Sequence, residues 1–326
     1  MQILMSEAAQ ARVADRLAAL GGDLDIVTIA ADGTIKRAGT AIDDADPEVF
    51  WLSLDLFPSG LIPAFVGHVL RGTRGRWLQS LAAGVDNPAF KTVIAKGIRL
   101  TKSSAQAPPI AEYVMAHALS LLHPIARQRL AQQARDWRQV PFHEIGASRW
   151  LMLGFGAIGT EIARRLQPFG ADLTVVRRHI APEPLAARVA PTADLISLLP
   201  DADVVVLACA LTDETRGIAG PAFFGAMKKG SLLINIARGG LVDEAALRAG
   251  LERDQPAQAV LDVFETEPLP KDAWFWDHPK VRVTAHGSNA GDGLAGRSDA
   301  LFLENLRRYR AGEPLLGEAH KSEVGL

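Results

Sequence analysis

The stretch "RWLMLGFGAIGTEIARRL", Arg149 to Leu166, decides the fold class of this chain. It is a short apolar run, a glycine-rich turn, and a segment whose apolar residues recur at helical spacing. In such a turn Gly154 permits the tight bend, Gly156 lets a pyrophosphate approach the backbone, and Gly159 allows the helix to pack closely on the strand. The amide groups at the start of the helix attract anions. We therefore expect a strand–turn–helix unit that binds a dinucleotide.

The same alternation of apolar runs and helical segments extends over most of the chain, which is typical of parallel sheets with crossover helices. The strands predicted before the glycine-rich turn are "QILM", "LDIVTIA", "VFWLSL", "RWLQSL" and "IRLTKSS", with helices between them over 7–20, 62–71 and 88–96. The strands predicted from the turn onward are "RWLMLG", "ADLTVV", "DVVVLA", "SLLINIA", "QAVLDVF" and "VRVTAH". We therefore expect an α/β protein with two doubly wound parallel sheets.

A chain of 326 residues exceeds the usual size of a single core, so two domains are expected. The pattern predicts a long helix from Ile110 to about Ala134, whose first turn tolerates the prolines at 108 and 109. A last helix, from Gly293 to Arg310, remains after the second series of strands and is expected to pack back on the first unit. We therefore predict a domain over 104–290 inserted in a discontinuous domain of 1–103 and 291–326.

Composition restricts the classes of partner. The net charge of −2 and the 48% of hydrophobic residues suit a soluble globular protein and argue against nucleic acid or a membrane surface as the main partner. Cys209 is the only cysteine, which excludes an intrachain disulfide and a cysteine-based zinc site, and we expect no metal. The start "MQILMSEAAQ" does not resemble a secretory signal, and no apolar run approaches the roughly 20 residues of a membrane span. A cytoplasmic protein is predicted.

Two adjacent arginines follow the second strand after the glycine-rich turn. In "LTVVRRH", Arg177 and Arg178 occupy the place where an NAD-binding chain usually has an acidic residue against the ribose hydroxyls. A guanidinium group can instead bind a 2′-phosphate through two parallel hydrogen bonds. We therefore predict that at least one of the pair binds this phosphate and that NADP(H) is preferred, with NAD(H) as the second possibility. The alternative is that both arginines end a strand and face water.

Three polar residues lie near the predicted carboxyl ends of strands in the second series, where open α/β sheets bind their ligands. They are Arg238 in "INIARGGLVDE", Glu267 in "LDVFETEPLP" and His286 in "VRVTAHGSN". Alone, each has an ordinary explanation as a loop cap, a solvated carboxylate or a structural histidine. Together, and in this order after a dinucleotide-binding loop, they indicate a catalytic site.

The chain resembles the D-isomer-specific 2-hydroxyacid dehydrogenases over nearly its whole length. The matching stretches are "LQSLAAGVDN", "IAEYVMAHALSLL", "LGFGAIG", "ALTDETRGI", "NIARGGLVDEAAL", "LDVFETEPLP" and "WDHPKVRVTAH". The resemblance implies a Rossmann dinucleotide-binding domain inserted in a flavodoxin-like substrate domain. Among the subgroups, the chain is most similar to the glyoxylate/hydroxypyruvate reductases.

The resemblance also implies roles for the three polar residues. His286 would be the general acid that gives a proton to the carbonyl oxygen as hydride arrives from the nicotinamide, and Glu267 would favour its protonated form. Arg238 would bind the substrate carboxylate and polarise the carbonyl group. Backbone amides near Ala83 and Gly84 would receive the same carboxylate.

The remaining cofactor contacts that the resemblance implies are Ala157, Ile158, Cys209, Ile236, Ala237 and Asp262. The first two would lie above the pyrophosphate, the cysteine near the adenosine, and the last three along the nicotinamide groove. An ordinary small buried residue is an equally good interpretation of Cys209.

A homodimer is expected, because the helix from Ile110 and the segment "ARDWRQVPFHE" resemble the dimer-forming region of the family. The function predicted is an NADP(H)-dependent reductase of small 2-oxo acids. Two alternatives stay open. One is an NAD-linked D-2-hydroxyacid dehydrogenase of the D-lactate or phosphoglycerate type, which the arginine pair disfavours. The other is a non-catalytic protein that senses a dinucleotide on the same fold.

Overall fold

The computed structural model describes residues 1–324 and 326, and these residues form two compact units. The first unit consists of Met1–Gln106 and Asp292–Leu326. The second unit is the continuous segment Ala107–Gly291. It begins three residues after the predicted boundary at 104 and ends one residue after the predicted boundary at 290.

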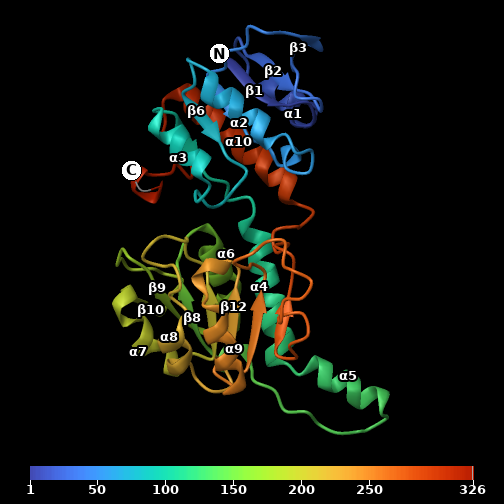
Figure 1. Ribbon diagram of the computed structural model, residues 1–326, viewed down its shortest axis with the longest axis vertical. Helices are drawn as coiled ribbons and strands as arrows, with labels where there is room; N and C mark the ends of the chain where they lie inside the picture. Colours follow the sequence, from blue (N-terminus) through green and yellow to red (C-terminus); the bar gives the residue numbers. More distant parts are fainter. Residues whose placement is uncertain (325) are drawn as a thin grey trace. The chain divides into compact units, whose positions relative to one another are not determined.

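The first unit contains a mostly parallel sheet of seven strands in the order β4-β3-β2-β1-β5-β6-β7. Figure 1 labels β1, β2, β3 and β6 of this sheet. Its parallel strands are β1 (Gln2–Ser6), β2 (Asp25–Ile29), β5 (Val49–Trp51), β6 (Trp77–Gln79) and β7 (Arg99–Thr101). Counted along the chain, these five strands lie in the order 2-1-3-4-5, which is the flavodoxin-like order.

A β-hairpin that the sequence pattern did not reveal extends this sheet at one edge. Strands β3 (Ile35–Arg37) and β4 (Thr40–Ala41) pair antiparallel with β2 and with each other. Ala38 and Gly39, which join them, both have positive φ, at 48° and 84°. Each strand is too short to show an alternating pattern, so the sequence predicted the parallel strands of this sheet but not its antiparallel edge.

Helices cover both faces of the first sheet. Helices α1 (Glu7–Ala19) and α10 (Leu294–Ala311) pack on one face, and α2 (Ile62–Arg71) and α3 (Pro88–Ala95) pack on the other. On the first of these faces, the ring of Trp51 from β5 stacks on Phe302 from α10 at 4.2 Å between centroids. The last helix therefore completes the core of the first unit, as predicted.

The second unit contains an entirely parallel sheet of seven strands in the order β10-β9-β8-β11-β12-β13-β14. The strands are β8 (Arg149–Leu153), β9 (Asp172–Val176), β10 (Arg188–Ala190), β11 (Val204–Leu207), β12 (Leu232–Asn235), β13 (Gln258–Leu261) and β14 (Val281–Val283). Counted along the chain, the first six lie in the order 3-2-1-4-5-6 of a dinucleotide-binding sheet, and β14 adds a seventh.

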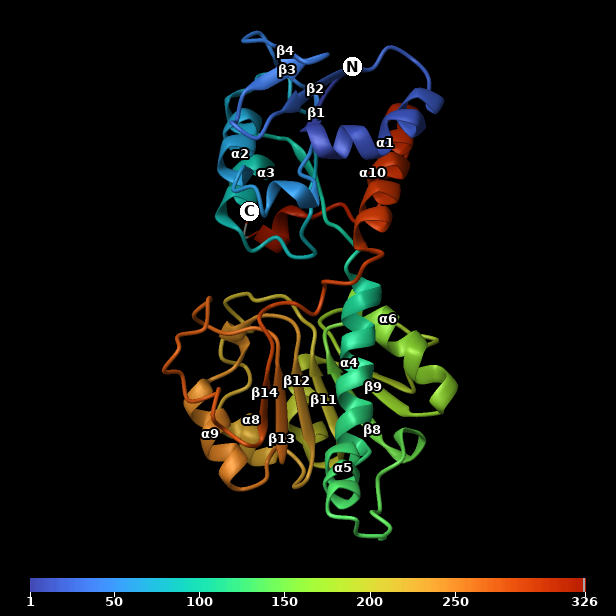
Figure 2. The same ribbon diagram turned by 90° about the vertical axis from the view of Figure 1, so that its right-hand side faces the viewer.

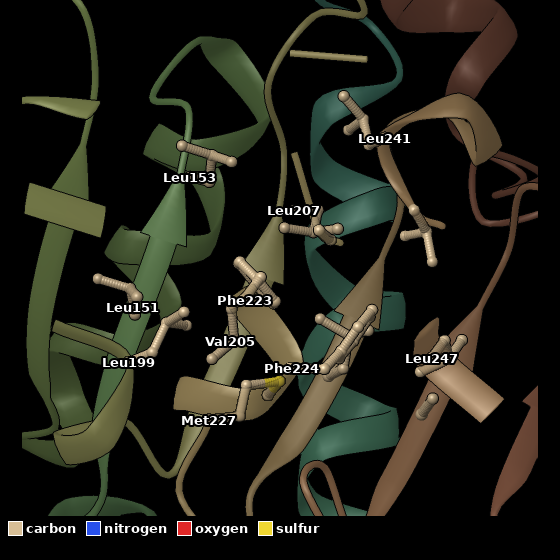
Figure 3. Close-up of a cluster of buried hydrophobic side chains, with 14 of the residues drawn as sticks. Leu151, Leu153, Leu199, Val205, Leu207, Phe223, Phe224, Met227, Leu241 and Leu247 are labelled. Carbon is tan, nitrogen blue, oxygen red and sulfur yellow. The ribbon is translucent and has the colours of Figure 1, made fainter. Parts of the chain in front are cut away.

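Alternate side chains of these strands enter two separate hydrophobic cores. Trp150 and Met152 of β8 face α4 (Ala107–Leu122) and α6 (Ala157–Leu166), and Figure 2 shows α4 running along this face of the sheet. Leu151 and Leu153 face the opposite core, which Figure 3 shows in close-up with Phe223 among its members. The helices on that side are α7 (Leu195–Leu198), α8 (Pro221–Ala226) and α9 (Glu244–Glu252). Burial on both faces explains the continuous apolar runs of these strands.

The predicted long helix from Ile110 to Ala134 is two helices. Helix α4 ends at Leu122, and α5 (Ile125–Gln133) begins after Pro124. A proline has no N–H to donate and disfavours the helical conformation of the residue before it, so the helix stops there. The prolines at 108 and 109 lie in the first turn of α4, where no such donor is needed.

Candidate active site

The glycine-rich turn joins β8 to α6, and two of its glycines are required by the chain itself. Gly154 has a φ of 94°, and a Cβ atom there would lie 2.6 Å from the Cα of Cys209 at the end of the neighbouring strand β11. A Cβ at Gly159 would lie 3.0 Å from the sulfur of Met152 in β8. The first glycine thus permits the bend and the last allows the helix to lie close to the strand.

Gly156 is different, because a Cβ atom at this position would meet no other atom within 4 Å. Gly156 is the residue immediately before α6, so the open space lies at the amino end of a helix. Ala157 is exposed and Ile158 half-buried in the first turn of that helix. An anionic group placed here would meet free amide groups and the positive end of the helix dipole. The turn therefore fits the pyrophosphate of a dinucleotide.

The two adjacent arginines at the end of β9 have different surroundings. Arg177 is folded back, since its Nη2 donates to the carbonyl oxygen of Ala181 at 2.7 Å and its Nη1 lies 3.8 Å from a carboxylate oxygen of Glu183. Its guanidinium also lies 5.8 Å from the ring centroid of Phe155 in the glycine-rich turn. Arg178 is exposed. Arg177 thus supports the loop, and Arg178 presents its charge to solvent.

Cys209 follows β11 and lies against the backbone of the glycine-rich turn. Burial raises the pKa of its thiol to about 11, so the group is protonated at neutral pH. Its position explains why Gly154 cannot carry a side chain. A role of Cys209 in contacting the adenosine stays a prediction.

The loop after β12, which carries Arg238, is organised by Asn235. The Asn235 side chain is buried, its Oδ1 accepts from the Ala237 amide at 3.1 Å, and its Nδ2 donates to the Arg238 carbonyl at 3.0 Å. Ile236 and Ala237 are buried beside it. Sequence reasoning missed Asn235, although a polar residue at the end of an apolar strand is a usable signal.

Gly239 brings this loop against the loop that carries Glu267. A Cβ atom at Gly239 would lie only 1.8 Å from the carbonyl carbon of Phe264, so no side chain fits. Phe264 in turn donates its amide to Glu267 Oε1 at 2.9 Å. The segments after β12 and β13 are therefore packed backbone to backbone, with Arg238 at the start of the contact.

The side chains of His286 and Glu267 are joined by a hydrogen bond. His286 Nδ1 lies 2.8 Å from Glu267 Oε2, and both side chains remain partly exposed. The other oxygen of Glu267 is the one that the Phe264 amide holds, so the carboxylate is fixed on both sides. His286 itself has a positive φ of 50°, a conformation that side-chain-bearing residues rarely adopt. The structure thus joins two of the three predicted catalytic residues directly.

Asp262 holds the loop on which His286 lies. It is fully buried, and its Oδ1 accepts from the Gly287 amide at 2.9 Å and from Thr284 Oγ1 at 2.6 Å. Its Oδ2 accepts from the Ser288 amide at 3.1 Å. The carboxylate is therefore engaged within the chain, and its predicted contact with the nicotinamide end stays a prediction.

Ala83 and Gly84 belong to the first unit, in the loop after β6. Both residues are half-buried. Ser80, at the end of the strand, braces this loop by accepting from the Ala82 amide at 2.9 Å. The binding of a substrate carboxylate by amides near Ala83 and Gly84 stays a prediction.

Residues 1–324 and 326 lack both a metal-binding cluster and a membrane-spanning helix. No group of three or more His, Cys, Asp and Glu side chains in this part of the chain could hold a metal ion. None of its helices is both long and apolar enough to cross a membrane.

Known proteins match this chain in sequence and in structure. A sequence profile described as the NAD-binding domain of the D-isomer specific 2-hydroxyacid dehydrogenases matches residues 115–288, more than half of the chain. The matched span includes the glycine-rich turn and all three predicted catalytic residues. Glyoxylate/hydroxypyruvate reductase A of Serratia proteamaculans is 32% identical over 238 residues, which cover 67% of this chain and 73% of the reductase.

Another relative is much longer than the aligned region, and one related crystal structure contains NADPH. D-3-phosphoglycerate dehydrogenase of Bacillus subtilis is 33% identical over 236 residues, but these span only 45% of that enzyme. The crystal structure of a D-isomer specific 2-hydroxyacid dehydrogenase from Xanthobacter autotrophicus Py2, in complex with NADPH and MES, is 26% identical with a TM-score of 0.76 and covers 98% of both chains. The chain belongs to the D-isomer specific 2-hydroxyacid dehydrogenase family.

Proposed function

We propose that the protein is an NADP(H)-dependent reductase that converts a small 2-oxo acid into a 2-hydroxy acid. The observation that carries this proposal is the pair of His286 and Glu267, whose ring nitrogen and carboxylate oxygen are 2.8 Å apart. A histidine held by a carboxylate is suited to give or take one proton near neutral pH. The nicotinamide would supply the hydride.

The contact with Glu267 decides which nitrogen of His286 does the chemistry. Because Nδ1 faces the carboxylate, Nε2 is the nitrogen that is left to donate a proton to the carbonyl oxygen. The Phe264 amide fixes the other oxygen of Glu267 and so limits rotation of the pair. In the reverse direction the same nitrogen would accept the proton of the hydroxyl group.

Arg238 would bind the carboxylate of the substrate and polarise its carbonyl group. The planar guanidinium suits both tasks, since it presents parallel N–H groups and keeps its charge. One of these groups, Nη1, donates to the Ala237 carbonyl at 2.7 Å, which anchors the side chain to its own loop. Amides near Ala83 and Gly84 are proposed to bind the same carboxylate.

Glyoxylate and hydroxypyruvate are the proposed substrates. The Serratia protein that supports this choice is named as a reductase of these two compounds, and this chain spans most of its length. The phosphoglycerate dehydrogenase that matches equally well in identity is more than twice as long as the aligned region. NADP(H) is the proposed preferred cofactor because exposed Arg178 lies where the 2′-phosphate is expected, and NAD(H) is the alternative.

A homodimer in the cytoplasm is the proposed state of the protein. Helix α5 and residues 134–144 extend away from the rest of the second unit (Figure 1). This segment, which we call the α5 arm, exposes large apolar side chains, including Trp137 at 102% and Leu130 at 61%. Exposed apolar groups gathered on one projection are typical of a surface that another chain covers. The single, poorly reactive thiol of Cys209 fits a reducing compartment.

The test is the initial rate of glyoxylate and of hydroxypyruvate reduction with NADPH, and separately with NADH. Replacing His286 with Gln should lower kcat by about 10²- to 10⁴-fold, the usual contribution of a general acid. NADPH binding, followed by its fluorescence, should be retained in this variant. Turnover that survives H286Q would remove His286 as the acid. No turnover by the native protein with either substrate, although NADPH binds, would favour a bulkier 2-oxo acid or the dinucleotide-sensing alternative.

A further inference from the structure

Two hydroxyl groups connect helix α4 to the loop that carries His286. Tyr113 Oη on α4 lies 2.7 Å from Thr284 Oγ1, and Thr284 Oγ1 lies 2.6 Å from Asp262 Oδ1. A carboxylate only accepts hydrogen bonds, so the single hydroxyl proton of Thr284 goes to Asp262. Tyr113 must then be the donor to Thr284. The result is a directed chain of hydrogen bonds from Tyr113 through Thr284 to Asp262.

The carboxylate at the end of this chain sets the backbone around His286. The Asp262 side chain accepts from the amides of Gly287 and Ser288, and its carbonyl accepts from the amide of His286 at 2.8 Å. His286 is thereby held at its φ of 50°, a conformation that persists only where the surroundings impose it. A change in the orientation of the Asp262 carboxylate would therefore move the imidazole relative to Glu267.

We infer that Thr284 and Tyr113 are positioning residues. Through the Asp262 carboxylate, they keep the imidazole of His286 aligned for its hydrogen bond to Glu267. Thr284 is the inner member, since it contacts Asp262 directly, and Tyr113 is the outer member. This inference rests on the proposed reductase function, because it assigns His286 as the acid. It adds that His286 is aligned by helix α4, which carries none of the three predicted catalytic residues.

The other ionisable groups beside this chain do not compete for the same hydrogen bonds. The ring of His117, one turn along α4, packs on Tyr113 at 4.3 Å between centroids, and burial lowers the pKa of that histidine. Arg282 on β14 donates to Ser120 Oγ at 2.9 Å. Burial raises the pKa of Tyr113 to about 12, so its hydroxyl remains a donor at neutral pH.

The decisive variants remove one hydroxyl at a time. Thr284→Val keeps the shape of the side chain and removes the donor to Asp262, whereas Thr284→Ser keeps the hydroxyl and removes a methyl group. Tyr113→Phe removes the outer donor. The matched control is Tyr309→Phe, which deletes the same atom from the other tyrosine of the chain, whose hydroxyl donates to Glu48 in the first unit.

For T284V we expect kcat for reduction to fall on the order of tenfold, the usual effect of losing a supporting hydrogen bond behind a functional group. The KM for the 2-oxo acid should stay unchanged, because the substitution touches neither Arg238 nor the amides near Ala83 and Gly84. The alkaline limb of the kcat profile should move to lower pH, since an imidazolium that is less well aligned with Glu267 is less stabilised. Y113F should show the same changes to a smaller extent, T284S should restore the native values, and Y309F should not differ from them.

A second measurement does not depend on turnover. The imidazole signals of His286, assigned by their loss in H286Q, can be titrated by NMR in the native protein and in T284V. We expect the midpoint of the His286 titration to be lower in T284V and unchanged in Y309F. An unchanged midpoint together with an unchanged kcat profile overturns the inference. A native protein that reduces no 2-oxo acid, but in which T284V still moves the midpoint, would overturn the proposed reaction and leave the alignment of His286 standing.

Discussion

Arg177 and Arg178 are neighbours in the chain, but their side chains have different surroundings. Arg177 donates to the Ala181 carbonyl and lies near Glu183, whereas Arg178 is exposed. Binding the 2′-phosphate with Arg177 would require these contacts to be broken. At the scale of the residue, we therefore propose Arg178 as the group that distinguishes NADP(H) from NAD(H).

We expect Arg178→Ala to raise the KM for NADPH roughly 10- to 100-fold, because hydrogen bonds to charged groups contribute about 1.5–3 kcal/mol. The KM for NADH should not change, since NADH lacks the phosphate. Steady-state kinetics with both cofactors check this. Arg177→Ala removes the same charge one position earlier and should affect both cofactors alike. A loss of NADPH preference in R177A alone would reverse the assignment.

The sequence could not separate these two residues. The spacing of the motif predicted that Arg177 and Arg178 lie at the end of the second strand, where the ribose of the cofactor is expected. Which arginine folds back depends on Ala181 and Glu183, which lie in an irregular segment with no periodic pattern. Thr284 and Tyr113 were missed for a similar reason, since their hydrogen bond joins residues 171 positions apart.

At the scale of the element, the strand–turn–helix unit of β8 and α6 contains glycines of two kinds. Gly154 is required by the fold, because it has a positive φ and touches the backbone at Cys209. Gly156 has open space beside it, and its absent side chain leaves room for a ligand. The motif alone predicted a glycine at both positions. It could not show that the fold requires the first glycine, whereas the second leaves room for a ligand.

Substituting alanine at each position should separate stability from cofactor binding. We expect Gly154→Ala to lower the free energy of unfolding by at least about 2 kcal/mol, through an unfavourable φ and a steric clash. Gly156→Ala should lower it by less than about 1 kcal/mol, yet weaken NADPH binding on the order of tenfold or more. Urea denaturation and fluorescence titration with NADPH measure the two effects. A G156A protein that binds NADPH normally would show that the pyrophosphate does not occupy this space.

The elements that the sequence predicted well are those with a long or repeated pattern. Strands with buried faces and helices such as α2 (Ile62–Arg71) follow from apolar runs and helical spacing. The hairpin of β3 and β4 was missed because strands of three and two residues have no period to detect. The break at Pro124 was missed although the proline was visible, because apolar residues continue on both sides of it.

At the scale of the whole molecule, the α5 arm predicts the state of association. We expect light scattering after gel filtration to give the mass of two chains for the native protein. Trp137→Glu combined with Leu130→Glu should give the mass of one chain, because charges replace apolar groups that a second chain would cover. Ile196→Glu changes another exposed apolar residue, on α7, and should leave the dimer intact. A native protein with the mass of a single chain would contradict the proposal.

Residues 317–319, near the carboxyl end of the first unit, should contribute less to its stability in acid than at neutral pH. The Lys102 amide donates to the Gly317 carbonyl and the Ala319 amide to the Leu100 carbonyl, so the segment pairs with edge strand β7. Arg99, with two hydrogen bonds to Glu318, holds the pKa of that carboxyl below its usual value of 4.5. A lowered pKa means that the pairing stabilises the fold above about pH 4.5 and that its contribution disappears as the pH falls through the lowered value.

We therefore expect Glu318→Gln to lower the melting temperature at pH 7, by an amount equivalent to about 1 kcal/mol or less for a partly exposed ion pair. The difference from the native protein should shrink steadily as the pH falls below 4.5, because the native carboxyl is protonated as well when the pH passes through its lowered pKa. Differential scanning calorimetry over a series of pH values from 7 downward measures this. A difference that does not shrink with falling pH would show that Glu318 acts through packing and not through its charge.

The discontinuity of the first unit also has a consequence for synthesis on the ribosome. Strands β5 and β6 leave the ribosome before the second unit is made, but α10, whose Phe302 covers their tryptophans Trp51 and Trp77, leaves it only afterwards. The second unit is continuous and can complete its core while the nascent chain is still growing. The apolar face awaiting α10 is therefore exposed while the whole second unit is synthesised, and this face is where a nascent-chain chaperone should bind.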